Sequence, residues 1–204
     1  MSQHALEQGR TAVVLHTRPA FEMNDEEFFD FCRINREFRI ELSADGDLIV
    51  MTPTGGETGH ANFEISGQVR DWARRDGTGV GFDSSTCFVL PNGAKRSPDV
   101  AWVSRDRLVP LTRAQKRRFI PLCPDFVIEL RSPGDELPTL LEKMREYAAN
   151  GARVGLLIDP LERRVHVTRP GSEPEVLEAP ASVEGLAVLP GFRLELADVS
   201  QPGF

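Results

Sequence analysis

Residues 124–132 read PDFVIELRS, an apolar run that is typical of a buried β-strand and carries one carboxylate near its centre. Side chains alternate along a strand, so Phe126 and Ile128 share one face while Glu129 lies on the other. Burying a carboxylate among Val, Ile and Leu is costly unless a cation or a metal pairs with it, which makes Glu129 a candidate functional residue. An ion pair on a solvated face, with Arg131 or across strands, explains the same pattern equally well.

A second carboxylate lies near the start of SPDVAWV, residues 97–103. In a strand, Asp99 and Ala101 share one face, and Val100 points to the other face. A Pro-Asp pair is also a common turn that precedes a strand, so the pair is a weak signal by itself. Beside a strand that carries Glu129, however, Asp99 would complete an oxygen site for a hard divalent cation.

Residues 137–150 have the apolar periodicity of a helix. Leu140, Met144 and Tyr147 define its buried stripe, and Lys143 lies on the edge of that stripe. Lys143 is therefore the charged residue of this helix that is best placed to reach back over a sheet. A lysine at such an edge also packs its methylene groups while its ammonium reaches solvent, and without the strand acids this is the simpler interpretation.

The remaining pattern predicts a succession of helices and strands around these segments. The predicted elements are a helix over 24–36, a β-hairpin over 38–51, a helix over 59–76, extended segments over 81–90, 97–103 and 125–131, a helix over 137–150, and strands over 154–158 and 164–168. From the second helix onward the order is αβββαβ, which predicts an α/β or α+β fold with one central mixed sheet. No repeat is visible, so we expect residues 1–204 to form a single domain with a partly mobile N-terminal segment over 1–20.

The charge of the chain limits the kind of partner it can bind. Its 204 residues include 24 Lys and Arg against 31 Asp and Glu, a formal net charge of −7, which excludes a simple histone-like binder of nucleic acid. The charge is uneven, because residues 105–118 carry six basic side chains and one acidic side chain. This segment is expected either to contact a nucleic-acid backbone or to be a solvated charged loop.

Two further features concern the compartment. No stretch approaches the roughly 20 apolar residues of a membrane span, and the start MSQHALEQGRTAVV lacks the apolar core of a signal peptide, so we expect a cytoplasmic protein. Cys32, Cys87 and Cys123 show no paired spacing of a zinc or redox site, and we expect them to be reduced, buried small hydrophobes.

Taken together, these residues resemble a known family. Pro98-Asp99, the segment VIELRSP with Glu129, and the segment LLEKMREYAANGARVGLLIDP are similar to the "putative restriction endonuclease" domain family of the PD-(D/E)xK nuclease superfamily. The resemblance extends over most of the chain. It implies an αβββαβ nuclease core, with Asp99 and Glu129 as ligands of Mg²⁺ or Mn²⁺ and a lysine that assists the attacking water.

The sequence departs from the superfamily pattern at one position. Two residues after the second carboxylate, where the pattern has lysine, this chain has Arg131. Arginine is effectively always protonated and is a poor base, although its forked guanidinium can hold a phosphate. Lys143 in the following helix resembles the migrated lysine of this family.

The resemblance also implies a further acid from the first helix of the core, for which Glu64 is the best match. His60 lies four positions earlier on the same helix face, so the two residues also suit an ordinary intrahelical pair. Glu41 in the hairpin has a family counterpart, but alternation places it beside Arg39, and a solvated hairpin face is the stronger interpretation.

The function that follows is metal-assisted hydrolysis of DNA phosphodiester bonds. Asp99 and Glu129, with Glu64, would hold the metal, Lys143 would position water, and Arg131 would contact phosphate. A homodimer is expected because a duplex has two strands to cut. The main alternative is a catalytically silent nuclease-fold protein that binds nucleic acid or a protein partner, which the arginine at 131 and the acidic surface suggest.

Overall fold

The structure is a computed structural model that describes residues 12–200. Its helices are α1 (Asp25–Ile34), α2 (Gly56–Asp76), α3 (Arg105–Leu108), α4 (Arg113–Lys116), α5 (Leu137–Ala149) and α6 (Ala197–Ser200). Its strands are β1 (Ala12–Leu15), β2 (Arg39–Leu42), β3 (Leu48–Met51), β4 (Gly79–Asp83), β5 (Phe88–Val89), β6 (Lys95–Arg96), β7 (Val100–Ser104), β8 (Phe126–Leu130), β9 (Val154–Asp159), β10 (Arg164–Thr168), β11 (Glu175–Glu178), β12 (Ser182–Glu184) and β13 (Arg193–Glu195).

A six-stranded mixed sheet forms the centre, in the order β11-β10-β9-β8-β7-β4. Strands β8 and β9 run parallel, because α5 connects them, and the other neighbours in this sheet are antiparallel. The order α2-β4-β7-β8-α5-β9 confirms the predicted αβββαβ core, into which the short strands β5 and β6 are inserted. The predicted extended segment over 81–90 is accordingly two strands, β4 and β5, rather than one.

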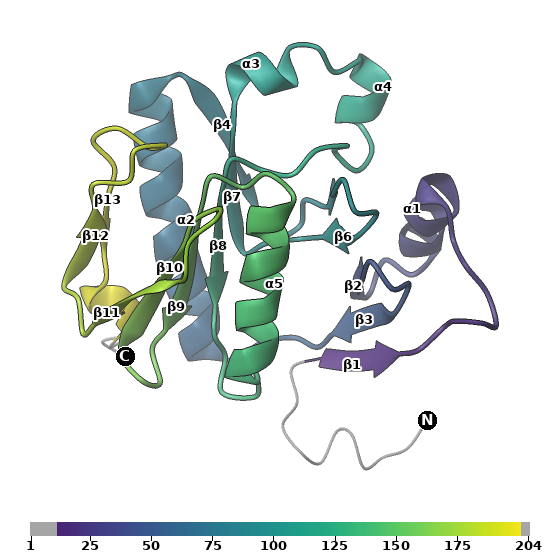
Figure 1. The fold of residues 1–204 in the computed structure, drawn as a ribbon, viewed down its shortest axis with the longest axis horizontal. Coiled ribbons are helices and arrows are strands. Elements are labelled where there is room, and N and C mark those ends of the chain that lie inside the picture. The colour runs from purple at the N-terminus through teal and green to yellow at the C-terminus, as the bar shows by residue number, and fades with distance from the viewer. Residues whose placement is uncertain (1–11, 201–204) are drawn as a thin grey trace.

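Helices cover both faces of this sheet, with α2 and α5 on opposite sides of β7 and β8 (Figure 1). Phe126 and Ile128 point to the face that α2 covers. Val127 points to the other face, where it packs in one cluster with Met144 and Tyr147 of α5. The alternation predicted for β8 is therefore confirmed, and it directs Glu129 toward α5.

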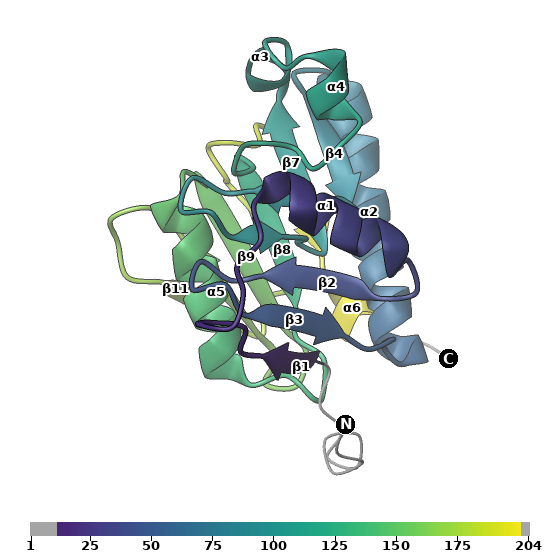
Figure 2. The ribbon, with the colours of Figure 1, turned by 90° about the vertical axis from the view of Figure 1, so that its right-hand side faces the viewer.

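A second sheet has the order β1-β3-β2-β6-β5, and its strands run across those of the central sheet (Figure 2). Helix α1, which begins with a capping box between Asn24 and Glu27, packs Phe28 against Ile40 and Leu42 of β2. One face of the β2–β3 hairpin is thus used by an apolar cluster. Its other face, which carries Glu41, is turned toward the central sheet and α5.

The described part of the N-terminal segment contains one strand. Within residues 1–20, which we expect to be partly mobile, Ala12–Leu15 form β1, which pairs antiparallel with β3 through four residue pairs. The apolar run of Ala, Val, Val and Leu is too short to stand out from a coil in sequence. The remainder of the predicted mobile segment, residues 1–11, lies outside the described residues.

The C-terminal elements pack against α2. Strands β12 and β13 pair with each other, and Leu194 and Phe192 lie in the same core cluster as Trp72 of α2. The Trp72 indole N–H donates to the Pro190 carbonyl at 3.0 Å. Within the described residues, no helix combines the length and apolar character needed to cross a membrane.

The three cysteines are free, as predicted. Cys87 and Cys123 are buried, and burial raises the pKa of the Cys123 thiol to about 12. Cys32 is only half-buried, contrary to the expectation, because it lies on the side of α1 at the margin of the apolar cluster.

Candidate active site

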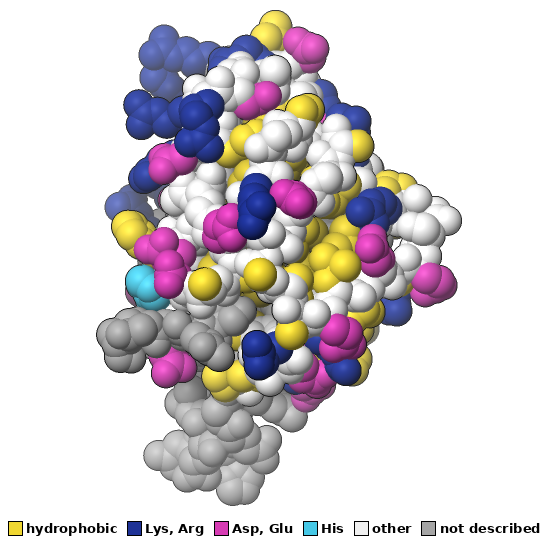
Figure 3. Space-filling model, turned by 90° about the vertical axis from the view of Figure 1, so that its left-hand side faces the viewer, with side chains coloured by type: hydrophobic (Ala, Val, Ile, Leu, Met, Phe, Trp, Pro, Cys, Tyr) yellow, Lys and Arg dark blue, Asp and Glu magenta, His cyan; other side chains and the backbone are white. Residues whose placement is uncertain are grey.

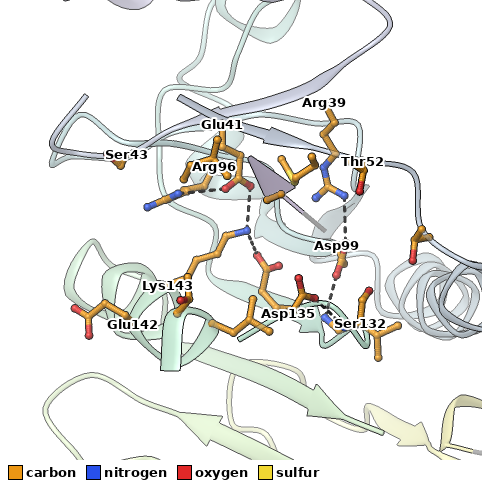
Figure 4. A pocket seen from close by; sticks show the side chains of 18 of the residues that line it. Arg39, Glu41, Ser43, Thr52, Arg96, Asp99, Ser132, Asp135, Glu142 and Lys143 are labelled. Atoms are coloured by element: carbon orange, nitrogen blue, oxygen red, sulfur yellow. Dashed lines mark hydrogen bonds and ion pairs between the residues drawn. The ribbon is translucent and has the colours of Figure 1, made fainter. Parts of the chain in front are cut away.

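A cavity of about 890 Å³ opens between β2, the loop before β7, the end of β8 and α5 (Figure 4). Eight acidic and three basic side chains line it, a formal charge of −5. The basic side chains are Arg39, Arg96 and Lys143, and each of them is paired with a carboxylate inside the cavity. The cavity is therefore an acidic site with its cations in fixed places.

The two central strands bring Asp99 and Glu129 together. Val100 is paired with Ile128 in the antiparallel register of β7 and β8, and continuing that register by one residue places Asp99 opposite Glu129. Asp99 Oδ2 accepts a hydrogen bond of 2.9 Å from the backbone N–H of Leu130. Its Oδ1 lies 3.3 Å from the guanidinium of Arg39. Asp99 is thus fixed by a backbone group and a strand side chain, not only by its turn.

Helix α5 supplies the lysine. Lys143 Nζ lies 2.9 Å from Glu129 Oε1 and 3.0 Å from Glu41 Oε1, so the ammonium bridges two carboxylates from different sheets. One turn later, the Tyr147 hydroxyl donates to the same Glu129 oxygen at 3.0 Å. Lys143 and Tyr147 are four residues apart and share a helix face, which is why both reach Glu129. Both donors bind to Oε1, so neither uses Oε2.

Glu41 belongs to this cluster, although the sequence favoured a solvated hairpin face for it. Its side chain is only 2% exposed. Its Oε1 accepts from the Ser97 N–H at 2.8 Å, and its Oε2 lies 3.2 Å from Arg96. Ile40 and Leu42 point toward α1, so alternation along β2 places Glu41 on the opposite face, where α5 covers it. The hairpin is therefore covered on both faces.

The electrostatics of the two glutamates differ. Burial raises the pKa of the Glu129 carboxyl from an ordinary 4.5 to about 7; Lys143 opposes this rise, and repulsion from Asp99 and Glu41 adds to it. Burial also opposes ionisation of Glu41, but Lys143 and Arg96 hold its pKa below the ordinary value. For Lys143, burial is outweighed by Glu129 and Glu41, which raise its pKa. The lysine is therefore a fixed cation at neutral pH and not a free base.

A family model described as "Uma2: Putative restriction endonuclease" matches residues 25–197. The chain belongs to the Uma2 family. The match covers all the charged side chains that line the cavity, and it confirms the resemblance drawn from the motifs around Asp99, Glu129 and Lys143. The family description supports a nuclease-like function for the chain.

The fold is also found in a solved structure. A protein described as a putative nuclease belonging to DUF820, from Anabaena variabilis, superposes with a TM-score of 0.69 at 20% sequence identity. The match covers 87% of this chain and 97% of that one. At this identity the similarity concerns the fold alone. No curated protein matches the sequence significantly.

Arg131 does not reach the cavity in this Uma2 protein. Its guanidinium lies 2.7 Å from Asp159 at the end of β9 and 3.5 Å from Glu162, and the hydrogen bond to Asp159 raises its pKa. The structure thus does not place Arg131 where the sequence predicted a phosphate contact. Asp159 is fully buried and also accepts two backbone N–H groups, so Arg131 neutralises a structural carboxylate.

Glu64 and His60 also lie away from the cavity lining, which α2 reaches through Thr58 and Asn62 instead. Relative to Ala61 of the buried stripe, positions 60 and 64 lie on one side of α2 and positions 58 and 62 lie on the other. The sequence shows the stripe but not which side of Ala61 faces the site.

The arrangement fits a hydrated divalent cation better than a closed metal cage. No group of three His, Cys, Asp or Glu side chains among residues 12–200 is arranged to hold a metal by itself. Asp99 and Glu129 nevertheless offer two adjacent, half-buried to buried oxygen donors, and their mutual repulsion is what a cation would relieve. Mg²⁺ commonly binds through one or two carboxylates and keeps several waters.

Proposed function

We propose that this Uma2 protein is a divalent-metal-dependent endonuclease that hydrolyses phosphodiester bonds in DNA. The observation that supports this most is the meeting of Asp99, Glu129 and Lys143 in one cavity, from three separate elements. Mg²⁺ or Mn²⁺ bound by the two carboxylates would supply Lewis-acid chemistry, polarising the phosphate and acidifying a bound water.

The protein's own groups have separate roles in this proposal. Lys143, held as a cation by Glu41 and Glu129, stabilises negative charge that develops on the phosphate and orients water beside it. Tyr147 and Lys143 fix Oε1 of Glu129, which sets the direction of its second oxygen. Arg39 keeps Asp99 in place and supplies a second positive charge beside the carboxylate pair.

Cleavage of plasmid DNA by the purified protein in Mg²⁺ or Mn²⁺ tests the proposal. We expect wild type to cut, and Asp99→Ala and Glu129→Gln to fall to background because each removes one of two oxygen ligands. Glu173→Gln is the matched control, since it makes the same charge change at an exposed acid outside the cavity. It should cut like wild type.

A second measurement separates this proposal from its alternative. Calorimetric titration with Mn²⁺ should detect binding to wild type and a loss of binding in Glu129→Gln. If wild type and Asp99→Ala give equal background cleavage and Glu129→Gln leaves Mn²⁺ binding intact, the endonuclease proposal is wrong. The protein would then be a catalytically silent nuclease-fold protein that binds nucleic acid or a protein partner.

A further inference from the structure

The positive charge of this chain is concentrated on one surface outside the cavity. Residues 70–76 and 105–118 carry nine basic and three acidic side chains, a net charge of +6, while the rest of the chain carries −13. The two segments are the end of α2 and the stretch that contains α3 and α4. An acidic protein thus keeps a strongly basic region.

Most of the cations of this region have no acidic partner, which is unusual for this chain. Of the Lys and Arg residues in 12–200, nine have no carboxylate within 4 Å, and six of these nine lie in the two segments. These six, which we call the basic surface, are Arg74, Arg75, Arg105, Arg113, Lys116 and Arg117. All six side chains are exposed. Elsewhere most cations are paired, so this surface holds most of the uncompensated positive charge.

The part of the basic surface on α2 adjoins the part at the start of α3. The N–H of Arg105 donates to the Thr78 carbonyl at 2.8 Å, which ties the start of α3 to the end of α2. Arg74 and Arg105 line one groove of about 770 Å³ beside the edge strand β4. Lys and Arg side chains gather at the upper left of Figure 3, over this end of the molecule.

Helix stability does not account for the whole surface. Arg74 and Arg75 lie in the last turn of α2, where cations complement the helix dipole. Arg113, Lys116 and Arg117 have no such function, because α4 has only four residues and its capping box is made by Thr112 and Gln115. Three adjacent cations without partners repel one another, so they favour a polyanionic ligand.

We propose that the basic surface binds the phosphate backbone of duplex DNA and does so without a metal. This proposal rests on the proposed function. It assigns DNA binding to the basic surface and phosphodiester hydrolysis to the cavity. The cavity carries a formal −5 and repels phosphate until a cation is bound, so it cannot supply the initial attraction. Exposed Arg and Lys side chains release counterions from DNA and supply such attraction independently of sequence.

Fluorescence anisotropy with a 20-bp duplex in EDTA tests this, because no cleavage occurs there and the result is independent of catalysis. The test variant combines Arg113→Gln, Lys116→Gln and Arg117→Gln. The matched control combines Arg36→Gln, Arg153→Gln and Arg163→Gln, the three exposed and unpaired cations outside the basic surface. Both variants lose the same charge. A second test variant, Arg74→Gln with Arg75→Gln and Arg105→Gln, covers the case in which the first fails to fold.

We expect the affinity of wild type to fall linearly with the logarithm of salt concentration. Loss of three phosphate contacts should reduce that slope by about 2 to 3 and weaken binding at low salt by roughly tenfold or more. The control should keep the wild-type slope. Equal losses in test and control variants, or displacement of DNA by polyglutamate of equal charge as effectively as by unlabelled duplex, would overturn the proposal.

Discussion

Glu41 and Glu129 bind the same ammonium, at 3.0 and 2.9 Å, yet the pKa of Glu41 is lowered and the pKa of Glu129 is raised. Glu41 has Arg96 and a backbone N–H besides Lys143, so its ionised form is well compensated. Glu129 shares Lys143 with Glu41 and lies opposite Asp99, so its ionised form is not. A buried carboxylate that stays under-compensated at neutral pH is typical of a functional site rather than a structural ion pair.

Replacing Glu129 tests this imbalance. The folded-state pKa of about 7 lies above the ordinary 4.5, so between these values the folded protein holds a proton that the unfolded chain releases. The free energy of unfolding therefore falls as pH rises through this window, by at most about 1.4 kcal/mol per pH unit. Without metal, Glu129→Gln should become progressively more stable than wild type from pH 4.5 to 7, as urea denaturation would measure. A difference that is constant with pH would contradict the raised pKa.

Replacing Glu41 should have the opposite effect. Its folded-state pKa is depressed, so its contribution is present above pH 4.5 and is lost as pH falls below that value. Glu41→Gln removes the charge that compensates Lys143 and Arg96 and should lower the free energy of unfolding at pH 7 by on the order of 3 kcal/mol. Thermal denaturation at pH 7 and pH 3.5 measures this, and the loss should shrink at the lower pH. A Glu41→Gln protein as stable as wild type at pH 7 would indicate a solvated carboxylate.

At the scale of elements, α5 and α2 position the site from opposite faces of the sheet. Met144 of α5 packs directly over Gly155 of β9, where a Cβ would lie 2.4 Å from the Met144 Cε methyl and 3.2 Å from Val127 Cγ2. This packing holds Lys143 and Tyr147 against Glu129. Helix α2, by contrast, contains Gly67 at a point where nothing lies within 4 Å of a Cβ. Gly67 therefore does not serve to make room for a neighbouring group.

Two alanine substitutions distinguish these glycines. Gly155→Ala should force the Met144 and Val127 side chains out of their present positions and reduce the free energy of unfolding by roughly 1–3 kcal/mol. Gly67→Ala should increase it by roughly 0.5–1 kcal/mol, because alanine favours the helical backbone and meets no clash. Urea denaturation checks both values at one pH. Destabilisation by both substitutions would show that α2 is packed more tightly at Gly67 than the structure indicates.

At the scale of the whole molecule, charge is divided between two surfaces. The cavity gathers acidic side chains from both sheets and α5, whereas α2, α3 and α4 present the basic surface. The net charge of −7 is therefore an average over regions of opposite sign. An acidic chain is compatible with a DNA substrate when a bound cation neutralises the place where phosphate must approach.

Proton release on metal binding tests this division. Glu129 must lose its proton to bind a cation, and its pKa of about 7 means that it is mostly protonated at pH 6. Mn²⁺ binding should therefore release about one proton at pH 6 and almost none at pH 8.5, and the apparent affinity should rise with pH up to about 7. Calorimetry in two buffers of different ionisation enthalpy measures the protons released. Binding with no proton release at pH 6 would exclude Glu129 as a ligand.

The sequence by itself determined the order of elements in the core and the faces of its strands. Alternation along β8 follows from covalent geometry, so Glu129 could be assigned to the face opposite Ile128 without a structure. The edge position of Lys143 follows from the helical repeat in the same way. The motifs around these residues were sufficient to indicate the family, and the match over residues 25–197 confirmed that assignment.

Only the tertiary structure decided which elements meet. Glu41 is buried because α5 closes over its hairpin, α2 reaches the cavity through Asn62 rather than Glu64, and Arg131 turns to Asp159. Local periodicity gives the direction of a side chain relative to its own element, but not the neighbour that element packs against. That neighbour is set by long-range packing of apolar faces, and it decides whether a charged side chain is solvated, structural or part of the site.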